Sequence, residues 1–250
     1  MSRPMLLRPA VFAGIPGLAA AFTTRHGGVS EPPYDTLNLS LSTADDPARV
    51  RENRRRLAEA LGFAPDALAV AGQVHGAEVR AVEAPGLYPG FDGLVTAAPG
   101  VPLCITAADC AAVLLADAGA GVVGACHAGW RGTAARIVPE TVAAMTTLGA
   151  SPARMRAYVG PCISAKHFEV GPEVAERFAP DFVRRFPGKA KPHVDLKAAL
   201  AAQLAEAGLP RAAVEVAPHC TFAGTADFFS HRAEGGVTGR MMGVIGLRGG

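Results

Sequence analysis

The sequence lacks the long runs of charge or of apolar residues that are typical of nucleic-acid and membrane proteins. Its 250 residues carry a net charge of +2, and no long basic run is present. An apolar stretch at residues 110–129 contains Asp117 and the turn sequence DAGAG. A membrane-spanning helix needs about 20 uninterrupted apolar residues, so this stretch does not qualify. We therefore expect neither a nucleic-acid partner nor a membrane partner.

Cysteine is also scarce, and its spacing argues against a disulfide framework. The five cysteines stand at positions 104, 110, 126, 162 and 220, an odd number without regular spacing. This pattern predicts a reducing compartment, and we expect a cytoplasmic protein. Residues 5–22 have the composition of a secretion signal, but Arg8, Pro9 and Pro16 interrupt the apolar run that such a signal needs.

Internal repeats and long linkers are absent as well, which favours one domain across residues 1–250. Half of the residues are apolar, so a sizeable core is expected. Strand-like and helical segments follow one another without regular βαβα alternation. This order predicts an α+β fold with layered mixed sheets rather than a doubly wound sheet.

The best-marked helix covers residues 47–61. Asp46 can cap it, Pro47 suits its first position, and Gly62 follows its end. Further helices are expected in the second half of 132–149, at 172–179 and at 194–209. Residues 67–83 are expected to form a strand, a tight turn and a strand, and other strands are expected at 91–97, 101–110, 213–217 and 241–247.

The segment of residues 108–132 is the most informative part of the chain. It predicts two buried strands, AAVLL and VVGAC, around the polar turn DAGAG. If the hairpin folds about that turn, residue 110 lies roughly opposite residue 128. Cys110 and His127 are then near neighbours, with Cβ atoms about 5–8 Å apart. A thiolate and an imidazole at that range can share a metal ion, or act as nucleophile and base.

A second histidine, His75 in the sequence QVHG, can complete a metal site. Two His and one Cys with a fourth position for water is a known arrangement of catalytic zinc. The spacing matches neither a zinc finger nor an HExxH helix, and the HxE and PCxxC signature of zinc nucleoside deaminases is missing. The residues alone therefore leave open a metal centre, a metal-free Cys–His pair, or a loop histidine that only forms hydrogen bonds.

Several polar residues beside glycines or apolar runs are further site residues. Arg25 and Arg131 can bind phosphate or carboxylate as guanidinium forks, or can stabilise their own loops. Asp109 can orient His75 or His127, act as a general base, or cap a strand end. Pocket-lining positions are expected at Asn38, Ser230 and Arg232.

The chain resembles the bacterial YfiH/YlmD family, also called the laccase-domain or peptidoglycan-editing-factor family. The resemblance rests on motifs that occur in order from residue 23 to residue 240: TTRHGGVSEPPYDTLNLS, DDPARVRENRRRLAEALG, QVHG, DGLVT, ADCAAVLLAD, HAGWRGT, GPCISAKHFEVG and FFSHR with TGR. One departure is SHRAEGG, which lacks the second Arg and the Asp expected after SHR.

The resemblance implies a single four-layer α/β/β/α sandwich, similar to the catalytic domain of cytotoxic necrotizing factors. It implies one catalytic zinc ion per chain on His75, Cys110 and His127. It also implies phosphorolysis of adenosine, inosine, guanosine and methylthioadenosine, with deamination of adenosine. The older name of multicopper oxidase fits poorly, because such oxidases need about ten His ligands and this chain has seven scattered His. We expect zinc rather than copper.

The leading hypothesis is thus a monomeric, zinc-dependent purine nucleoside phosphorylase with adenosine deaminase activity. Cys110 and His127 belong to its catalytic centre, Arg25 and Arg131 hold phosphate, and Asp109 transfers a proton. The alternative is an amidase that edits UDP-muramyl-amino-acid precursors of peptidoglycan, with Cys110 as ligand or as nucleophile and His127 as base. A non-catalytic zinc-stabilised binding protein is disfavoured, because a structural zinc ion has no open position.

Overall fold

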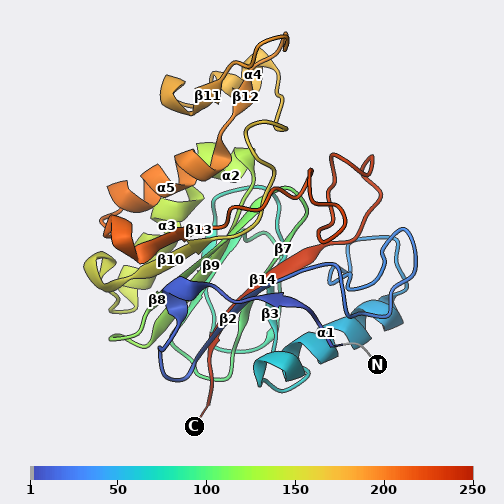
Figure 1. Ribbon diagram of the computed structural model, residues 1–250. Coiled ribbons are helices and arrows are strands. Elements are labelled where there is room, and N and C mark those ends of the chain that lie inside the picture. Colours follow the sequence, from blue (N-terminus) through green and yellow to red (C-terminus); the bar gives the residue numbers. More distant parts are fainter. Residues whose placement is uncertain (1–2, 250) are drawn as a thin grey trace.

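Two six-stranded sheets lie face to face, with helices on both outer sides (Figure 1). The computed structural model describes residues 3–249. The layers run helix, sheet, sheet, helix, which confirms the mixed-sheet sandwich expected from the sequence and the resemblance. Both sheets contain parallel and antiparallel pairs.

The first sheet joins strands from both ends of the chain. Its order is β1 (Leu6–Leu7), β2 (Leu18–Thr23), β14 (Met241–Leu247), β7 (Leu103–Ala107), β3 (Ala69–Ala71) and β5 (Gly86–Tyr88). The second sheet has the order β13 (Val214–Val216), β10 (Arg156–Val159), β8 (Ala111–Asp117), β9 (Val122–Ala128), β6 (Gly93–Thr96) and β4 (Val79–Ala81).

Helices cover the two outer faces. One outer face carries α1 (Pro47–Leu61), and the other carries α2 (Trp130–Ala134), α3 (Ile137–Thr147) and α5 (Leu196–Glu206). A small unit projects from the body and contains α4 (Pro172–Ala175), β11 (Val183–Arg184) and β12 (His193–Val194) (Figure 1). Short 3-10 turns occur at Ala10–Phe12, Pro152–Arg154, Pro180–Phe182 and Arg211–Ala213. No helix within residues 3–249 is long and apolar enough to cross a bilayer.

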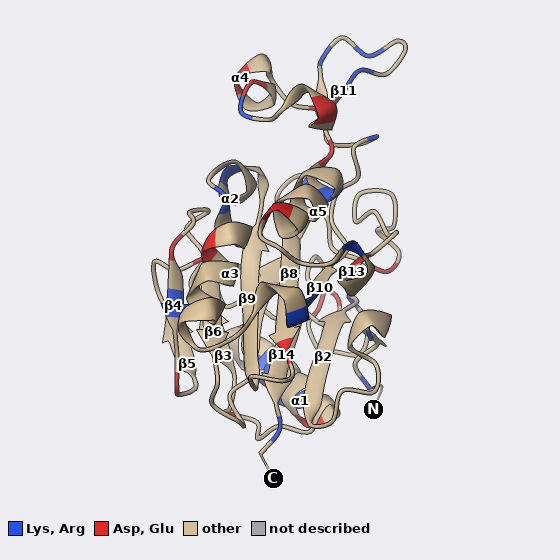
Figure 2. Ribbon diagram, turned by 90° about the vertical axis from the view of Figure 1, so that its left-hand side faces the viewer, with Lys and Arg blue, Asp and Glu red and all other residues tan. Residues whose placement is uncertain are grey.

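The apolar residues of the hairpin strands are shared between two interfaces. Along β8, Leu114 packs between the two sheets, and its neighbours Val113 and Leu115 pack against the helices on the outer face. Because both faces of β8 are buried, its sequence is a continuous apolar run rather than an alternating one. Figure 2 shows that Lys, Arg, Asp and Glu lie mainly on helices, loops and edges, whereas β8 and β9 are almost free of them.

Helix α1 has the bounds and caps that its sequence predicts. The Asp46 side chain accepts a hydrogen bond from the backbone N–H of Ala48 at 2.8 Å. Gly62 ends the helix with φ +80°, a conformation that glycine adopts without strain. The buried residues Leu57 and Leu61 pack on the outer face of the first sheet.

Three local predictions differ from the structure. Residues 172–179 form a helix only at Pro172–Ala175. The helix expected in the second half of 132–149 is present as α3, but a further helix, α2, precedes it, and Arg136 with φ +63° separates the two. Residues 67–83 contain the two expected strands, but residues 72–78 between them are not a tight turn, because β3 and β4 belong to different sheets and the chain crosses between them.

Candidate functional site

Two crossings between the sheets meet at one end of the sandwich. The chain passes from β3 to β4 through residues 72–78, which carry His75. It passes from β7 to β8 through residues 108–110, which carry Asp109 and Cys110. His127 lies near the end of β9, beside the first residues of β8. Three separate segments therefore bring His75, Cys110 and His127 together.

The three side chains form a cluster with the geometry of a metal site. One ligand atom from each lies within 4.8 Å of the others. The rings of His75 and His127 are nearly perpendicular, with centroids 4.9 Å apart. Two imidazole nitrogens and one thiolate are a donor set that suits zinc. His75 is exposed, Cys110 is half-buried and His127 is buried, so the cluster reaches solvent on the His75 side.

The hairpin register places Cys110 one residue away from the predicted pairing. Ala111 pairs with Ala128 and Ala112 pairs with His127, so Cys110 faces Gly129 rather than residue 128. A Cβ atom on Gly129 would lie 2.7 Å from the sulfur of Cys110. The missing side chain of Gly129 thus makes room for the thiol.

A fully buried carboxylate, Asp92, holds two of the three side chains in place. Its Oδ1 accepts a hydrogen bond from Nδ1 of His127 at 2.8 Å and one from the backbone N–H of His75 at 3.0 Å. Its Oδ2 accepts bonds from the N–H groups of Val74 and Gly76 at 3.0 and 2.8 Å. His127 is thereby left with Nε2 for the cluster, and the loop of His75, which has φ +63°, is fixed.

Asp92 was missed in the sequence analysis, although it stands in the motif DGLVT. The sequence offers only one indication of this role, namely that Asp92 stands directly before a buried strand. The role of orienting His127, expected from the sequence for Asp109, belongs in the structure to Asp92.

The charged forms of Cys110 and His127 stabilise each other. Burial tends to raise the pKa of Cys110, but His127 and His75 beside it lower the pKa to about 6. Burial tends to lower the pKa of His127, but Cys110 and Asp92 raise it to about 9. Burial raises the pKa of Cys104, Cys126 and Cys162 to about 12. Half-buried Cys110 is therefore ready to bind a metal or to act as a nucleophile, unlike the three fully buried thiols.

Asp109 directly precedes Cys110, and its carboxylate is hydrogen-bonded to residues outside the cluster. Its carboxylate accepts hydrogen bonds from Thr221 Oγ1 at 2.6 Å, from Ser230 Oγ at 2.7 Å and from the N–H of Arg232 at 2.7 Å. It adopts φ +83°, which is uncommon outside glycine. Asp109 thus ties the Cys110 segment to residues 221–232.

The other predicted contact residues lie around the site rather than in the cluster. Arg25 is paired with Asp35 and Glu234. Arg131 is exposed, and its guanidinium lies 4.4 Å from the centroid of the Trp130 ring.

Two further residues, predicted to line the pocket, instead form hydrogen bonds within the protein. Asn38 is fully buried, and its side chain is hydrogen-bonded to Thr43, Asp45 and the N–H of Arg240. Arg232 donates to the backbone oxygen of Glu169. Neither of them lines the cavity beside the cluster.

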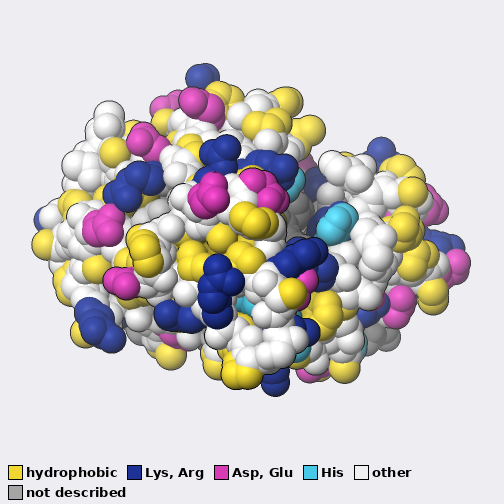
Figure 3. All heavy atoms as spheres, turned by 90° about the horizontal axis from the view of Figure 1, so that it is seen from above, with side chains coloured by type: hydrophobic (Ala, Val, Ile, Leu, Met, Phe, Trp, Pro, Cys, Tyr) yellow, Lys and Arg dark blue, Asp and Glu magenta, His cyan; other side chains and the backbone are white. Residues whose placement is uncertain are grey.

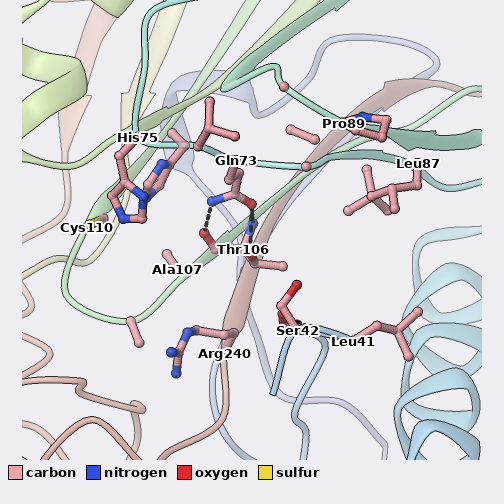
Figure 4. A pocket seen from close by; sticks show the side chains of 18 of the residues that line it. Leu41, Ser42, Gln73, His75, Leu87, Pro89, Thr106, Ala107, Cys110 and Arg240 are labelled. Carbon is pink, nitrogen blue, oxygen red and sulfur yellow. Dashed lines mark hydrogen bonds between the residues drawn. The ribbon is translucent and has the colours of Figure 1, made fainter. Parts of the chain in front are cut away.

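A cavity of about 670 Å³ opens onto the cluster (Figure 4). No Asp or Glu lines it, whereas two arginines and three histidines do. Its wall consists of Ser40, Leu41, Ser42, Arg54, Val70, Ala71, Gly72, Gln73, Val74, His75, Leu87, Pro89, Gly90, Thr106, Ala107, Ala108, Cys110, His127, His231 and Arg240. Of the residues predicted for the site, the cavity contains the three proposed ligands but neither Arg25 nor Arg131.

Comparisons with known proteins agree with this architecture. The Deinococcus radiodurans protein named purine nucleoside phosphorylase is 50% identical over 238 residues, covering 93% of this chain and 91% of its own. A Streptomyces griseus protein with the same name is 40% identical over 237 residues, covering 91% and 93%.

Solved structures show the same likeness. YlmD from Geobacillus stearothermophilus is 36% identical with a TM-score of 0.90, covering 98% of this chain and 96% of its own. YfiH from Bacillus licheniformis, titled a hypothetical protein, is 30% identical with a TM-score of 0.91, covering 99% and 97%. A family model described as multi-copper polyphenol oxidoreductase laccase matches residues 19–248. The chain therefore belongs to the laccase-domain family that includes YlmD and YfiH.

Proposed function

We propose that this protein is a zinc-dependent purine nucleoside phosphorylase that also deaminates adenosine. Its substrates are adenosine, inosine, guanosine and methylthioadenosine, each with phosphate. The observation that carries the proposal is the His75–Cys110–His127 cluster at the base of a cavity without carboxylates. The names of the relatives support the same reaction class.

Zinc fits the donor set better than copper. His75, Cys110 and His127 would hold the ion and leave a fourth position toward the cavity. A blue-copper site adds a weak axial methionine to the same donor set, and no methionine lines this cavity. Residues 3–249 contain a single cluster of this kind, which does not suit a multicopper enzyme. Bound zinc would supply stabilisation of negative charge and a water of lowered pKa for deamination.

Phosphorolysis requires a bond to form and a bond to break at C1′ of the ribose. A phosphate oxygen bonds to C1′ while the bond from C1′ to the purine nitrogen breaks, and that electron pair leaves with the base. The departing purine then needs a proton. His231 is the titratable side chain in the cavity that is neither a proposed ligand nor a guanidinium, so we propose it as the proton donor. Asp109, with three hydrogen bonds to its carboxylate, is then a positioning residue.

The test is nucleoside turnover by purified protein of known zinc content. Adenosine with phosphate should give adenine and ribose 1-phosphate, and adenosine without phosphate should give inosine. If no nucleoside is turned over and UDP-muramyl-serine is hydrolysed instead, the protein is an amidase.

A further inference from the structure

Two arginines form the part of the cavity wall that is rich in unused hydrogen-bond donors. Arg54 comes from α1, and Arg240 directly precedes β14. Arg54 donates through Nε to the backbone oxygen of Leu39 at 2.8 Å. Arg240 donates through Nη1 to the backbone oxygens of Thr238 and Gly239 at 2.7 and 2.9 Å. No carboxylate within residues 3–249 pairs with either guanidinium, so their other N–H groups are free for a ligand.

A single segment fixes both arginines. The Oδ1 of Asn38 accepts from the N–H of Arg240 at 2.9 Å, and the N–H of Leu39 donates to the oxygen of Arg240 at 3.1 Å. The oxygen of Leu39 accepts from Arg54. Because this segment is buried, the two guanidinium groups are positioned before any ligand arrives, which lowers the entropy cost of binding. Figure 4 shows Arg240 extending into the cavity toward the side on which Ala107 and Cys110 lie.

The electrostatics of the cavity favour an anion. Burial lowers the pKa of Arg54 and of Arg240, which reflects the cost of keeping each cation away from water; for Arg240 the nearby charges of Cys110 and Asp109 oppose this lowering only in part. An anion held by both would offset that cost through charged hydrogen bonds. Ser42, an exposed residue that lines the same cavity, offers a neutral hydroxyl donor.

Part of the cavity wall is apolar and exposed. Of five large hydrophobic residues that are exposed within residues 3–249, three line this cavity: Leu41, Val74 and Leu87, which are 46, 61 and 64% exposed. On the face seen from above, Figure 3 shows exposed hydrophobic side chains with both basic and acidic side chains around them. A flat, uncharged base matches the apolar part, and an anion matches the arginines.

We propose that Arg54, Arg240 and Ser42 form the subsite for inorganic phosphate, while Leu41, Val74 and Leu87 contact the purine. This assignment rests on the proposed function only in taking phosphate as the second substrate. It replaces the expected role of Arg25 and Arg131, because Arg25 is paired with Asp35 and Glu234 and neither arginine lines the cavity.

The experiment compares Arg240→Lys and Arg54→Gln with the matched control Arg211→Gln, an exposed arginine outside the cavity. Unchanged circular dichroism and zinc content show that each variant is folded. Binding of inorganic phosphate is measured by calorimetry without nucleoside, and the phosphate KM is measured at saturating inosine.

In Arg240→Lys the phosphate KM should rise about 10-fold to 150-fold, since lysine cannot replace a bidentate fork. The inosine KM and the rate of adenosine deamination should change less than about threefold.

The possible results distinguish the phosphate subsite from the proposed phosphorylase reaction. Phosphate could bind to the parent protein but not to Arg240→Lys, while the parent protein shows no phosphorolysis. That result would support the phosphate subsite and refute the proposed phosphorylase activity. Phosphorolysis with an unchanged phosphate KM in both variants refutes the subsite. If AMP competes with adenosine through Arg240 while inorganic phosphate does not bind, the subsite serves the phosphate group of a nucleotide and the proposal is wrong.

Discussion

Cys110 differs from the buried cysteines in the groups around its sulfur. Two imidazoles lower its pKa to about 6, whereas burial without such partners raises the pKa of Cys126 to about 12. Cys126 lies within β9, and Cys110 directly precedes its partner strand β8. The difference between a reactive and an inert thiol is therefore set by the immediate neighbours rather than by burial.

Replacing Cys110 by alanine should remove the zinc ion without unfolding the protein. The change takes away the only sulfur ligand but no part of a strand. We expect close to one zinc per chain in the parent protein and less than about a tenth of that in Cys110→Ala, measured by atomic emission after dialysis. Cys126→Ala is the matched control and should keep its zinc. Full zinc occupancy in Cys110→Ala would contradict the assignment of the ligand.

Asp92→Asn should weaken zinc binding although Asp92 touches no metal position directly. The amide nitrogen of asparagine cannot accept a hydrogen bond, so at least one of His127, Val74, His75 and Gly76 loses its partner. We expect zinc affinity to fall by about 10-fold to 100-fold, measured by competition with a chromophoric chelator. Asp227→Asn, at an exposed carboxylate, is the control. Equal affinities in Asp92→Asn and in the control would show that Asp92 does not orient the ligands.

The site residues come together because the chain passes from one sheet to the other beside the cluster. Both connections that leave the first sheet beside the cluster, β3 to β4 and β7 to β8, enter the second sheet. The strands themselves were predictable from apolar runs. Their assignment to sheets was not, since residues 67–83 contain the same local signals as a hairpin.

The opposite end of the β8–β9 hairpin is closed by a buried carboxylate, Asp117. It accepts hydrogen bonds from the N–H groups of Gly119, Ala120 and Ser151 at 3.0, 3.2 and 2.8 Å, and from Arg154 at 2.8 Å. Burial tends to raise the pKa of Asp117, but these donors lower it. The hairpin turn and the segment after α3 are thus joined through one side chain.

Asp117→Asn should lower the free energy of unfolding at pH 7 by about 2–3 kcal/mol, because charged hydrogen bonds are lost. A lowered folded-state pKa stabilises the protein above the unfolded-state pKa of about 3.9, and that stabilisation is lost as the pH falls through the folded-state pKa. Urea unfolding at pH 7 and at pH 3 measures both effects. The gap between parent and variant should narrow at pH 3, and a constant gap would show that the carboxylate charge does not stabilise the fold. Asp66→Asn, at an exposed position, should show neither effect.

For the molecule as a whole, a bound ion would link segments that the backbone leaves far apart in sequence. His75, Cys110 and His127 come from a sheet crossing, a strand start and a strand end. A ligand that binds only the folded state stabilises it by an amount that grows with its concentration.

Removing zinc with a chelator should therefore lower the melting temperature. With free zinc about 1,000-fold above its Kd the gain is about 4 kcal/mol, which corresponds to a shift of roughly 8–16 °C for a protein of this size. Scanning calorimetry with and without chelator checks this. Cys110→Ala should melt at the lower temperature in both conditions, and a chelator response equal to that of the parent protein would mean that the zinc lies elsewhere.

The sequence by itself determined the features that depend on neighbouring residues. The caps of α1 and the β8–β9 hairpin, which brings Cys110 near His127, follow from local hydrogen bonding and apolar periodicity. His75 was added to this pair from its motif, without a local structural reason. Tertiary structure alone decided which polar groups meet at the site. Asp92 reaches His127 across 35 residues of chain, and Asn38 reaches Arg240 across 202. Arg25 and Arg131, equally favourable by sequence, lie outside the cavity that Arg54 and Arg240 line, because packing of the two sheets fixes which loops face the cavity.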